Sequence, residues 1–143
     1  MKLDVSSFEK AIGQLESALN TFDSKIVQDN PDLVVHVRAG AIQAFEFVYE
    51  LACKLIKRYL EMSEPVREEI DHMSFSMLIR TAFEKGLLTS DVNQWRLYRD
   101  YRCATSHTYA EDKAAQVFDE LSLFLKEAKA LLAALQKRND TCQ

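Results

Sequence analysis

Arg102 and His107 are the side chains of this sequence whose types and spacing could do chemistry. Arginine is a permanent cation whose donor fork fits phosphate, and histidine, with an ordinary pKa of about 6.5, can give or take a proton near neutrality. The segment Thr108–Glu111 matches the capping box that begins a helix, and a helix N-terminus favours anions. Together these groups could bind and polarise an RNA phosphodiester, with His107 as general acid or base.

The geometry of a helix restricts how Arg102 and His107 can meet. Positions five apart on a continuous helix point about 140° away from each other, so the two share a site only if the helix ends between them. The sequence predicts such an end near Cys103, where weaker helix formers begin. Arg102 itself projects between Trp95 and Tyr98, on an aromatic face where a cation needs a partner or a site.

A structural role explains the same residues, and on spacing alone it is the favoured interpretation. In that case Arg102 pairs with Asp100 or Glu111, and backbone groups satisfy the ring of His107. A phosphate site and a helix boundary therefore remain open alternatives at this point.

A small basic ridge leads up to Arg102, because Arg96 and Arg99 precede it at intervals of three residues. One interpretation is an ion-paired face with Asp91 and Asp100. The other is a path for an RNA backbone. In the second case the stacking surfaces are Trp95, Tyr98 and Tyr101.

Metal chemistry has little support in the sequence. His36, His72 and His107 lack HxxxH or HExxH spacing, and Glu46 and Glu50 have no ExxH companion. The cysteines form no CxxC pair, so we expect reduced thiols and no metal site. We interpret the two glutamates as surface, interface or partner-facing charge.

The elements that position these residues are helices. The chain has 143 residues, 48% of them hydrophobic, with only 3 Gly and 2 Pro, which favours few and long elements. Apolar spacing predicts helices over residues 8–22, from Pro31 to about Met62, over 75–83 with Gly86 closing the helix, from Ser90 to about Cys103, and over 114–135. We expect one all-α domain over residues 1–138, an antiparallel up-and-down bundle of four main helices plus a short one, with a frayed tail over 139–143.

The helix that begins at Pro31 carries more apolar surface than one packing partner needs. Phe45, Phe47, Val48, Tyr49, Leu51 and Ala52 cover much of its circumference, and a dimer interface would explain this pattern. On the remaining stripe, Glu46, Glu50, Lys54 and Arg58 follow at intervals of four residues, a spacing at which opposite charges pair along one helix.

Charge and hydropathy limit the partners and the cellular location that we expect. With 18 basic and 22 acidic side chains the formal net charge is 18 − 22 = −4, which argues against holding nucleic acid by a broad basic surface. The first residues lack the layout of a signal peptide, and apolar runs are too short to span a membrane. We expect a cytoplasmic protein with no membrane partner.

The Arg-x₄-His-x-Tyr pattern at Arg102, His107 and Tyr109 resembles the signature of HEPN-domain proteins. The segment ATSHTYAE is similar to the nucleotidyltransferase substrate-binding branch of that family, which includes HepT-type toxins. Two further segments, 43–54 and 80–88 followed by Trp95, also resemble that branch, so the likeness covers most of the chain.

The resemblance implies a helical bundle that forms a homodimer, with two motifs in a cleft at the dimer interface. It implies a partner, a separately encoded minimal nucleotidyltransferase of the MNT type that uses ATP and Mg²⁺, while this chain carries no cofactor. The pair would be of the toxin–antitoxin kind, with this chain as the subunit that binds substrate or nucleotide. The alternative is a metal-independent endoribonuclease that acts on RNA and is silenced by AMP transfer.

The resemblance also assigns roles by position. Catalysis falls to Arg102 and His107, phosphate or nucleotide binding to Arg102, Ser106, His107 and Thr108, and modification to Tyr109. Many active HEPN ribonucleases carry a polar residue directly after the motif arginine, where this chain has Cys103. We expect Cys103 to be a buried structural cysteine.

Overall fold

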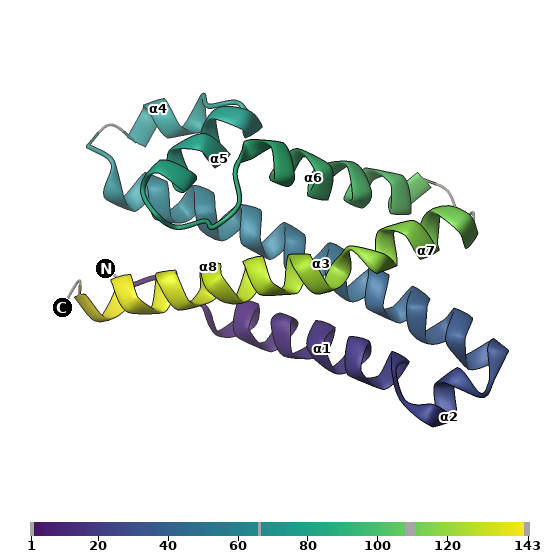
Figure 1. Ribbon diagram of the computed structural model, residues 1–143. Helices are drawn as coiled ribbons and strands as arrows, with labels where there is room; N and C mark the ends of the chain where they lie inside the picture. The colour runs from purple at the N-terminus through teal and green to yellow at the C-terminus, as the bar shows by residue number, and fades with distance from the viewer. Residues whose placement is uncertain (1, 66, 108–110, 142–143) are drawn as a thin grey trace.

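The computed structural model describes residues 2–65, 67–107 and 111–141, with the side chains of 105–107 and 111 outside the description. These residues form an all-α bundle, which confirms the predicted fold class (Figure 1). The helices of the described chain are α1 (Ser6–Phe22), α2 (Lys25–Gln28), α3 (Pro31–Ser63), α4 (Arg67–Asp71), α5 (Phe75–Glu84), α6 (Val92–His107), α7 (Glu111–Asp119) and α8 (Leu121–Thr141).

Helix α3 is the axis on which the other helices pack. Its start was predictable, because the side chain of Asn30 accepts a hydrogen bond from the amide of Asp32 and Pro31 occupies the first helical position. The helix runs for 33 residues to Ser63, just before Pro65. In Figure 1, α1 and α8 lie along one side of α3, while α5 and α6 lie along another.

The core centres on Phe124 of α8. Its ring lies 4.9 Å from that of Phe45 on α3 and 5.0 Å from that of Tyr98 on α6, both in edge-to-face geometry. Trp95 stands edge-on to Tyr98, and both side chains are fully buried. Aromatic pairs of this kind stabilise the core beyond their buried area and fix the rotation of α6 against α3.

The loop between α5 and α6 is held by local backbone chemistry and by one buried acid. Gly86 has a φ of +79°, so it closes α5 in the left-handed conformation that the sequence predicts. Glu127 of α8 is buried, and its carboxylate accepts hydrogen bonds from the Thr89 amide, the Thr89 hydroxyl and the Ser90 hydroxyl. Ser90 is therefore not the cap of α6; Asp91 accepts from the Gln94 amide instead.

Two boundaries differ from the sequence prediction. The last helix is divided at Glu120, whose amide bonds to the carbonyl of Val117 in a short turn that separates α7 from α8. Apolar residues keep their helical spacing through this turn, so the pattern does not reveal it. Helix α8 also extends to Thr141, past the expected start of the tail, because Asn139 exchanges hydrogen bonds with the backbone of Leu3.

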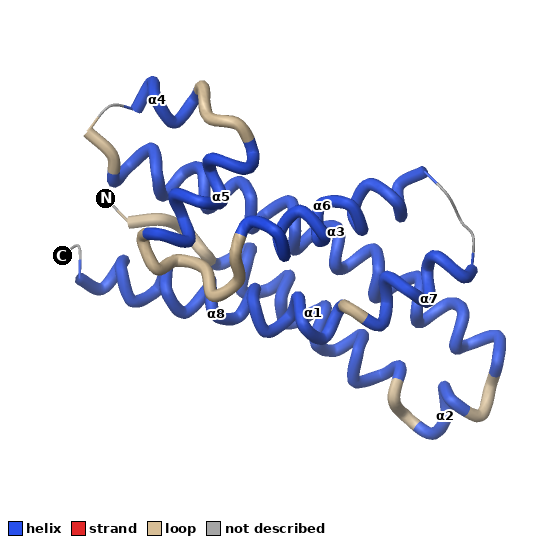
Figure 2. The backbone as a smooth tube through the Cα atoms, turned by 45° about the horizontal axis from the view of Figure 1, so that its top comes forward, coloured by secondary structure: helices blue, strands red, loops and turns tan. Residues whose placement is uncertain are grey.

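The short helices α2 and α4 were also not predicted. Figure 2 shows them in the two connections that flank α3, one at each end of the bundle. Among the described helices, none is both long and apolar enough to cross a membrane.

Candidate functional site

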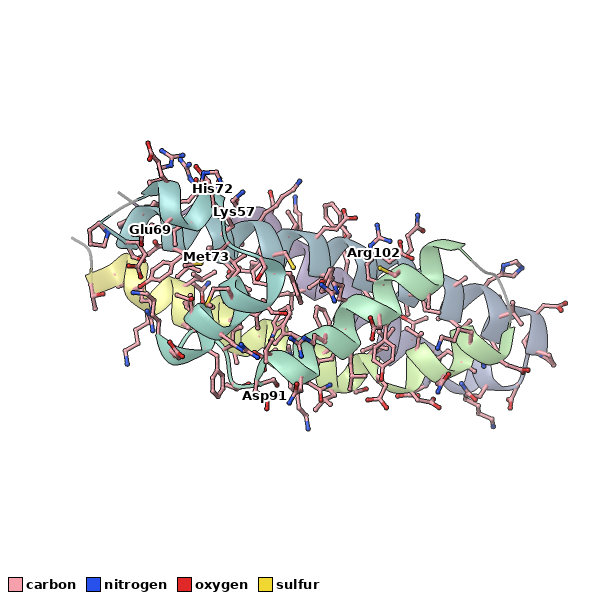
Figure 3. All side chains as sticks on the ribbon, turned by 90° about the horizontal axis from the view of Figure 1, so that it is seen from above. Lys57, Glu69, His72, Met73, Asp91 and Arg102 are labelled. Atoms are coloured by element: carbon pink, nitrogen blue, oxygen red, sulfur yellow. The ribbon has the colours of Figure 1, made fainter. Side chains whose placement is uncertain are left out.

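Arg102 reaches from α6 to two carboxylates on α3. Its Nη2 lies 2.6 Å from Oε1 of Glu50, and its Nη1 lies 3.6 Å from Oε2 of Glu46. The structural alternative proposed Asp100 or Glu111 as partners, on or near its own helix. Asp100 forms no ion pair with it, and the side chain of Glu111 lies outside the described part of the structure. The described partners come from a different helix, so the ion pair joins α6 to α3. Figure 3 shows Arg102 at the outer edge of the bundle, on the side that α3 occupies.

This contact also changes the interpretation of the acidic stripe on α3. Glu46 and Glu50 do not pair along their own helix, because both face Arg102. Among the described residues, Lys54 and Arg58 take part in no ion pair. The sequence contained one signal for the true arrangement, since a cation on the aromatic face of α6 needs carboxylates from the helix opposite.

The electrostatics of the cluster keep Arg102 charged and oriented. The hydrogen bond to Glu50 raises the pKa of the Arg102 guanidinium, burial opposes this, and the charge of Glu46 adds to the rise. The Arg102 side chain is 25% exposed, so solvent and an anionic ligand can reach it. One cation and two carboxylates sum to a charge of −1, so an incoming phosphate must compete with the glutamates for the donor fork.

Helix α6 does not end near Cys103, which corrects the boundary on which a shared site depends. The helix continues through His107. Positions 102 and 107 of this continuous helix are about 140° apart, so one helix does not direct Arg102 and His107 to the same point. The HEPN resemblance implies two copies of the motif in one dimer cleft, which would let Arg102 of one copy meet His107 of the other.

The remaining motif residues are only partly described. Ser106 lies with His107 in the last turn of α6, but the side chains of both are outside the described part of the structure. Thr108 and Tyr109 lie outside the described residues altogether. Helix α7 begins at Glu111, the last residue of the predicted capping box.

Cys103 is exposed, which corrects the expectation of a buried structural cysteine. The thiol next to the motif arginine is therefore open to solvent in the single chain. The other described cysteine, Cys53 of α3, is half-buried, and burial raises the pKa of its thiol to about 11.

The basic ridge is not an ion-paired face with Asp91 and Asp100. Arg96 donates to the hydroxyl of Ser76, with Nη2 at 3.0 Å, and the guanidinium of Arg99 lies 4.6 Å from the ring centre of Phe75. Both contacts fix α6 to α5. Trp95 and Tyr98 are fully buried, so they offer no surface on which an RNA base could stack.

Metal-ligating side chains do not gather in the described part of the chain. No group of three or more histidines, cysteines or acids there could hold a metal ion.

Comparison with known proteins gives similar chains over nearly the whole length. A family model described as "Nucleotidyltransferase substrate binding protein like" matches residues 3–137. A relative from Haemophilus influenzae, named "Probable ribonuclease HepT", is 38% identical over 146 aligned positions, covering 96% of this chain and 95% of the relative.

Two solved structures are similar as well. A structure from Haemophilus influenzae, described as the fold of a substrate binding domain of a nucleotidyltransferase, is 34% identical with a TM-score of 0.87, covering 93% of this chain and 99% of that one. A crystal structure from Thermus thermophilus is 28% identical with a TM-score of 0.70, covering 90% and 98%.

Proposed function

Because the chain belongs to the nucleotidyltransferase substrate-binding protein family, we propose that it is the binding subunit of a two-protein system, paired with a separately encoded minimal nucleotidyltransferase. In this proposal the two form a toxin–antitoxin type pair. The partner supplies ATP and Mg²⁺, and this chain supplies the surface that receives the nucleotide, including Tyr109 as the residue that accepts AMP.

The proposal rests on the guanidinium of Arg102, which two carboxylates of α3 orient. A quarter of the side chain remains open. An oriented, partly exposed arginine loses little side-chain freedom on binding phosphate oxygens, although the phosphate must compete with Glu46 and Glu50 for its donors. Its place on the last turns of α6 puts it on the segment that leads to Tyr109.

The test is co-expression with the candidate transferase, followed by copurification and intact mass measurement after addition of ATP and Mg²⁺. We expect a complex and one AMP group on Tyr109, lost in Tyr109→Phe and kept in Tyr101→Phe, a matched tyrosine on α6. The proposal is overturned if no complex forms and no residue carries an AMP adduct.

A second function is favoured by the relative named as a ribonuclease, which is 38% identical over nearly the whole chain. In this alternative the protein cleaves RNA without a metal, with Arg102 holding the phosphate and His107 transferring the proton. Because α6 is continuous through His107, the active site takes Arg102 from one copy and His107 from another.

Phe47 supports an interface between two copies. It follows Glu46 directly on α3, and its side chain is 51% exposed, although the core of α3 on the opposite face is fully buried. A hollow of about 540 Å³ that Phe47 itself lines lies between α1 and α3, and Gly40 and Ala44 of α3 also line it. A two-fold interface at Phe47 would bury this surface and bring the Arg102 clusters of two copies near each other.

Complementation between inactive variants tests the two-copy site. Arg102→Ala and His107→Ala should each lose RNA cleavage in EDTA, while Arg80→Ala, an exposed control on α5, should keep it. When the two inactive variants are mixed and refolded together, half of the dimers are mixed and one of their two sites is intact, so about a quarter of the activity should return. If no activity returns, both residues act within one chain. If His107→Ala cleaves RNA as fast as the wild type, the proposed ribonuclease mechanism is wrong.

A further inference from the structure

A second hollow lies between the start of α1 and the last half of α3. Its volume is about 410 Å³, within the usual range for small-molecule sites. The apolar floor comes from the half-buried Leu51 and Leu55, with the fully buried Phe8 beneath them, and the rim carries Lys54, Lys57 and Arg58. Figure 3 shows Lys57 on the same long edge of the molecule as Arg102.

The three rim cations are exposed, so a ligand can reach them. None of them takes part in an ion pair within the described chain, and Glu50, which could pair with Lys54 along α3, faces Arg102 instead. By contrast, Lys85 is paired with Glu64 at 2.6 Å.

The two acids that also line the hollow have partners of their own. A carboxylate oxygen of Asp4 accepts from the amide and the hydroxyl of Ser6. Glu61 pairs with Arg67 at 3.0 Å. Glu61 is offset by Arg67, whereas Asp4 keeps its negative charge because Ser6 is neutral. Three cations and one acid thus leave the hollow a net positive charge beside an apolar floor, in a protein whose net charge is −4.

We propose that this hollow binds a nucleotide, with its phosphates on Lys54, Lys57 and Arg58 and its base on the apolar floor. Three cations on adjacent turns of one helix fit a ligand that carries several negative charges, and the two half-buried leucines give the flat face of a base an apolar surface to lie on. The nucleotide is either free or part of an RNA strand, since both present the same groups.

The hollow is distinct from the Arg102 cluster but next to it. Lys54 lies one helical turn, about 6 Å along the axis, beyond Glu50 on α3. A ligand in the hollow would thus lie beside the glutamate that holds Arg102. The inference does not rest on the proposed function, because the residues that form the hollow belong to neither the Arg102 cluster nor the Tyr109 segment.

The test compares a triple variant, Lys54→Gln, Lys57→Gln and Arg58→Gln, with a control that removes the same charge elsewhere, Lys25→Gln, Lys126→Gln and Lys137→Gln. All six side chains are exposed. Calorimetric titration with ATP should give a dissociation constant about tenfold or more higher for the triple variant, and one within about twofold of wild type for the control. Circular dichroism confirms that both variants are folded.

Two further ligands sharpen the outcome. Tripolyphosphate carries the charge of ATP without a base, so it should bind more weakly than ATP to the wild type. A single-stranded RNA oligonucleotide that competes with ATP for the hollow identifies a strand as the natural source, and one that does not compete identifies a free nucleotide.

Three results overturn the inference: no binding of ATP or RNA to the wild type, equal losses in the triple variant and the control, or tripolyphosphate binding as tightly as ATP. Titration of Arg102→Ala with ATP separates the two sites. Retained ATP affinity together with lost cleavage or AMP transfer assigns those activities to Arg102 alone.

Discussion

The guanidinium of Arg102 lies 2.6 Å from the carboxylate of Glu50, a residue 52 positions earlier in the chain. The contact joins α6 to α3. The sequence suggested partners on or near α6, whereas the described partners of Arg102 lie on α3, the longest described helix. The position of the motif therefore depends on the rotation of α3 as much as on α6.

Replacing Glu50 with glutamine tests the charge balance of this cluster. The sum of Arg102, Glu46 and Glu50 changes from −1 to zero, so affinity for an RNA oligonucleotide should rise severalfold, as measured by fluorescence anisotropy. Unfolding free energy in urea should change by less than about 1 kcal/mol, because the pair is partly exposed. Glu68→Gln, at an exposed site on α4, should change neither quantity. A lower RNA affinity in Glu50→Gln would show that orientation of Arg102 outweighs the charge.

Truncation of Phe124 tests the aromatic core. This ring contacts aromatic partners from α3 and α6 at once, so Phe124→Ala leaves a cavity between three helices. We expect a loss of about 3–5 kcal/mol in unfolding free energy, and a smaller loss for Phe124→Leu. Urea denaturation followed by circular dichroism measures both. The control Phe83→Ala removes a ring that is 42% exposed and should cost less than about 1 kcal/mol.

Gly86 and Gly13 offer opposite outcomes for the same substitution. At Gly86 the φ of +79° disfavours any side chain, and an added Cβ would meet Nη2 of Arg138 at 3.4 Å. Gly86→Ala should therefore lower the unfolding free energy by about 1–2 kcal/mol. Gly13 lies inside α1 with nothing within 4 Å of its added Cβ, so Gly13→Ala should raise it by up to about 1 kcal/mol. Equal effects at the two sites would contradict this account.

The two described cysteines should react at different rates. Burial raises the pKa of the Cys53 thiol to about 11, so little thiolate exists at pH 8, whereas Cys103 is exposed. In a Cys142→Ser background, iodoacetamide at pH 8 should modify Cys103 well before Cys53, as followed by peptide mass spectrometry. The rate at Cys53 should rise as the pH approaches 11.

The same raised pKa has a consequence for stability. The folded state keeps the Cys53 proton up to about pH 11, while the ordinary thiol of the unfolded chain loses it near pH 9.0. The contribution of Cys53 is therefore complete below pH 9 and lost as the pH rises toward 11. Cys53→Ala should flatten this part of the curve of unfolding free energy against pH; an unchanged slope would contradict the assignment.

Much of the fold could be predicted from the sequence, because it follows from local chemistry. The Asn30–Pro31 cap, the glycine at position 86 and the apolar spacing of α3 each act within a few residues. The errors occurred where tertiary contacts decide. The turn at Glu120 interrupts a helix without interrupting its apolar pattern, and Ser90, a good cap by type, is drawn to the buried Glu127 instead.

The candidate site was predictable only in part. The motif predicts roles for Arg102 and His107, but the described partners of Arg102 are on a helix distant in sequence, and no spacing rule connects them. The burial of Cys103 was inferred from residue type, while its exposure follows from which side of α6 faces α3. For Trp95 and Tyr98 of α6, the helical spacing of aromatic residues marked a face packed in the core. It did not mark a surface for stacking bases.

Glu127 gives this protein a built-in reporter for spectroscopy. Its buried carboxylate accepts a hydrogen bond from the Thr89 amide. The amide proton should therefore exchange with deuterium only when α8 and the α5–α6 loop separate. The loop directly precedes α6, which carries Arg102 and ends at His107. A single amide resonance, remote from the motif itself, can thus follow whether the motif helix is docked or released when a partner or a ligand binds.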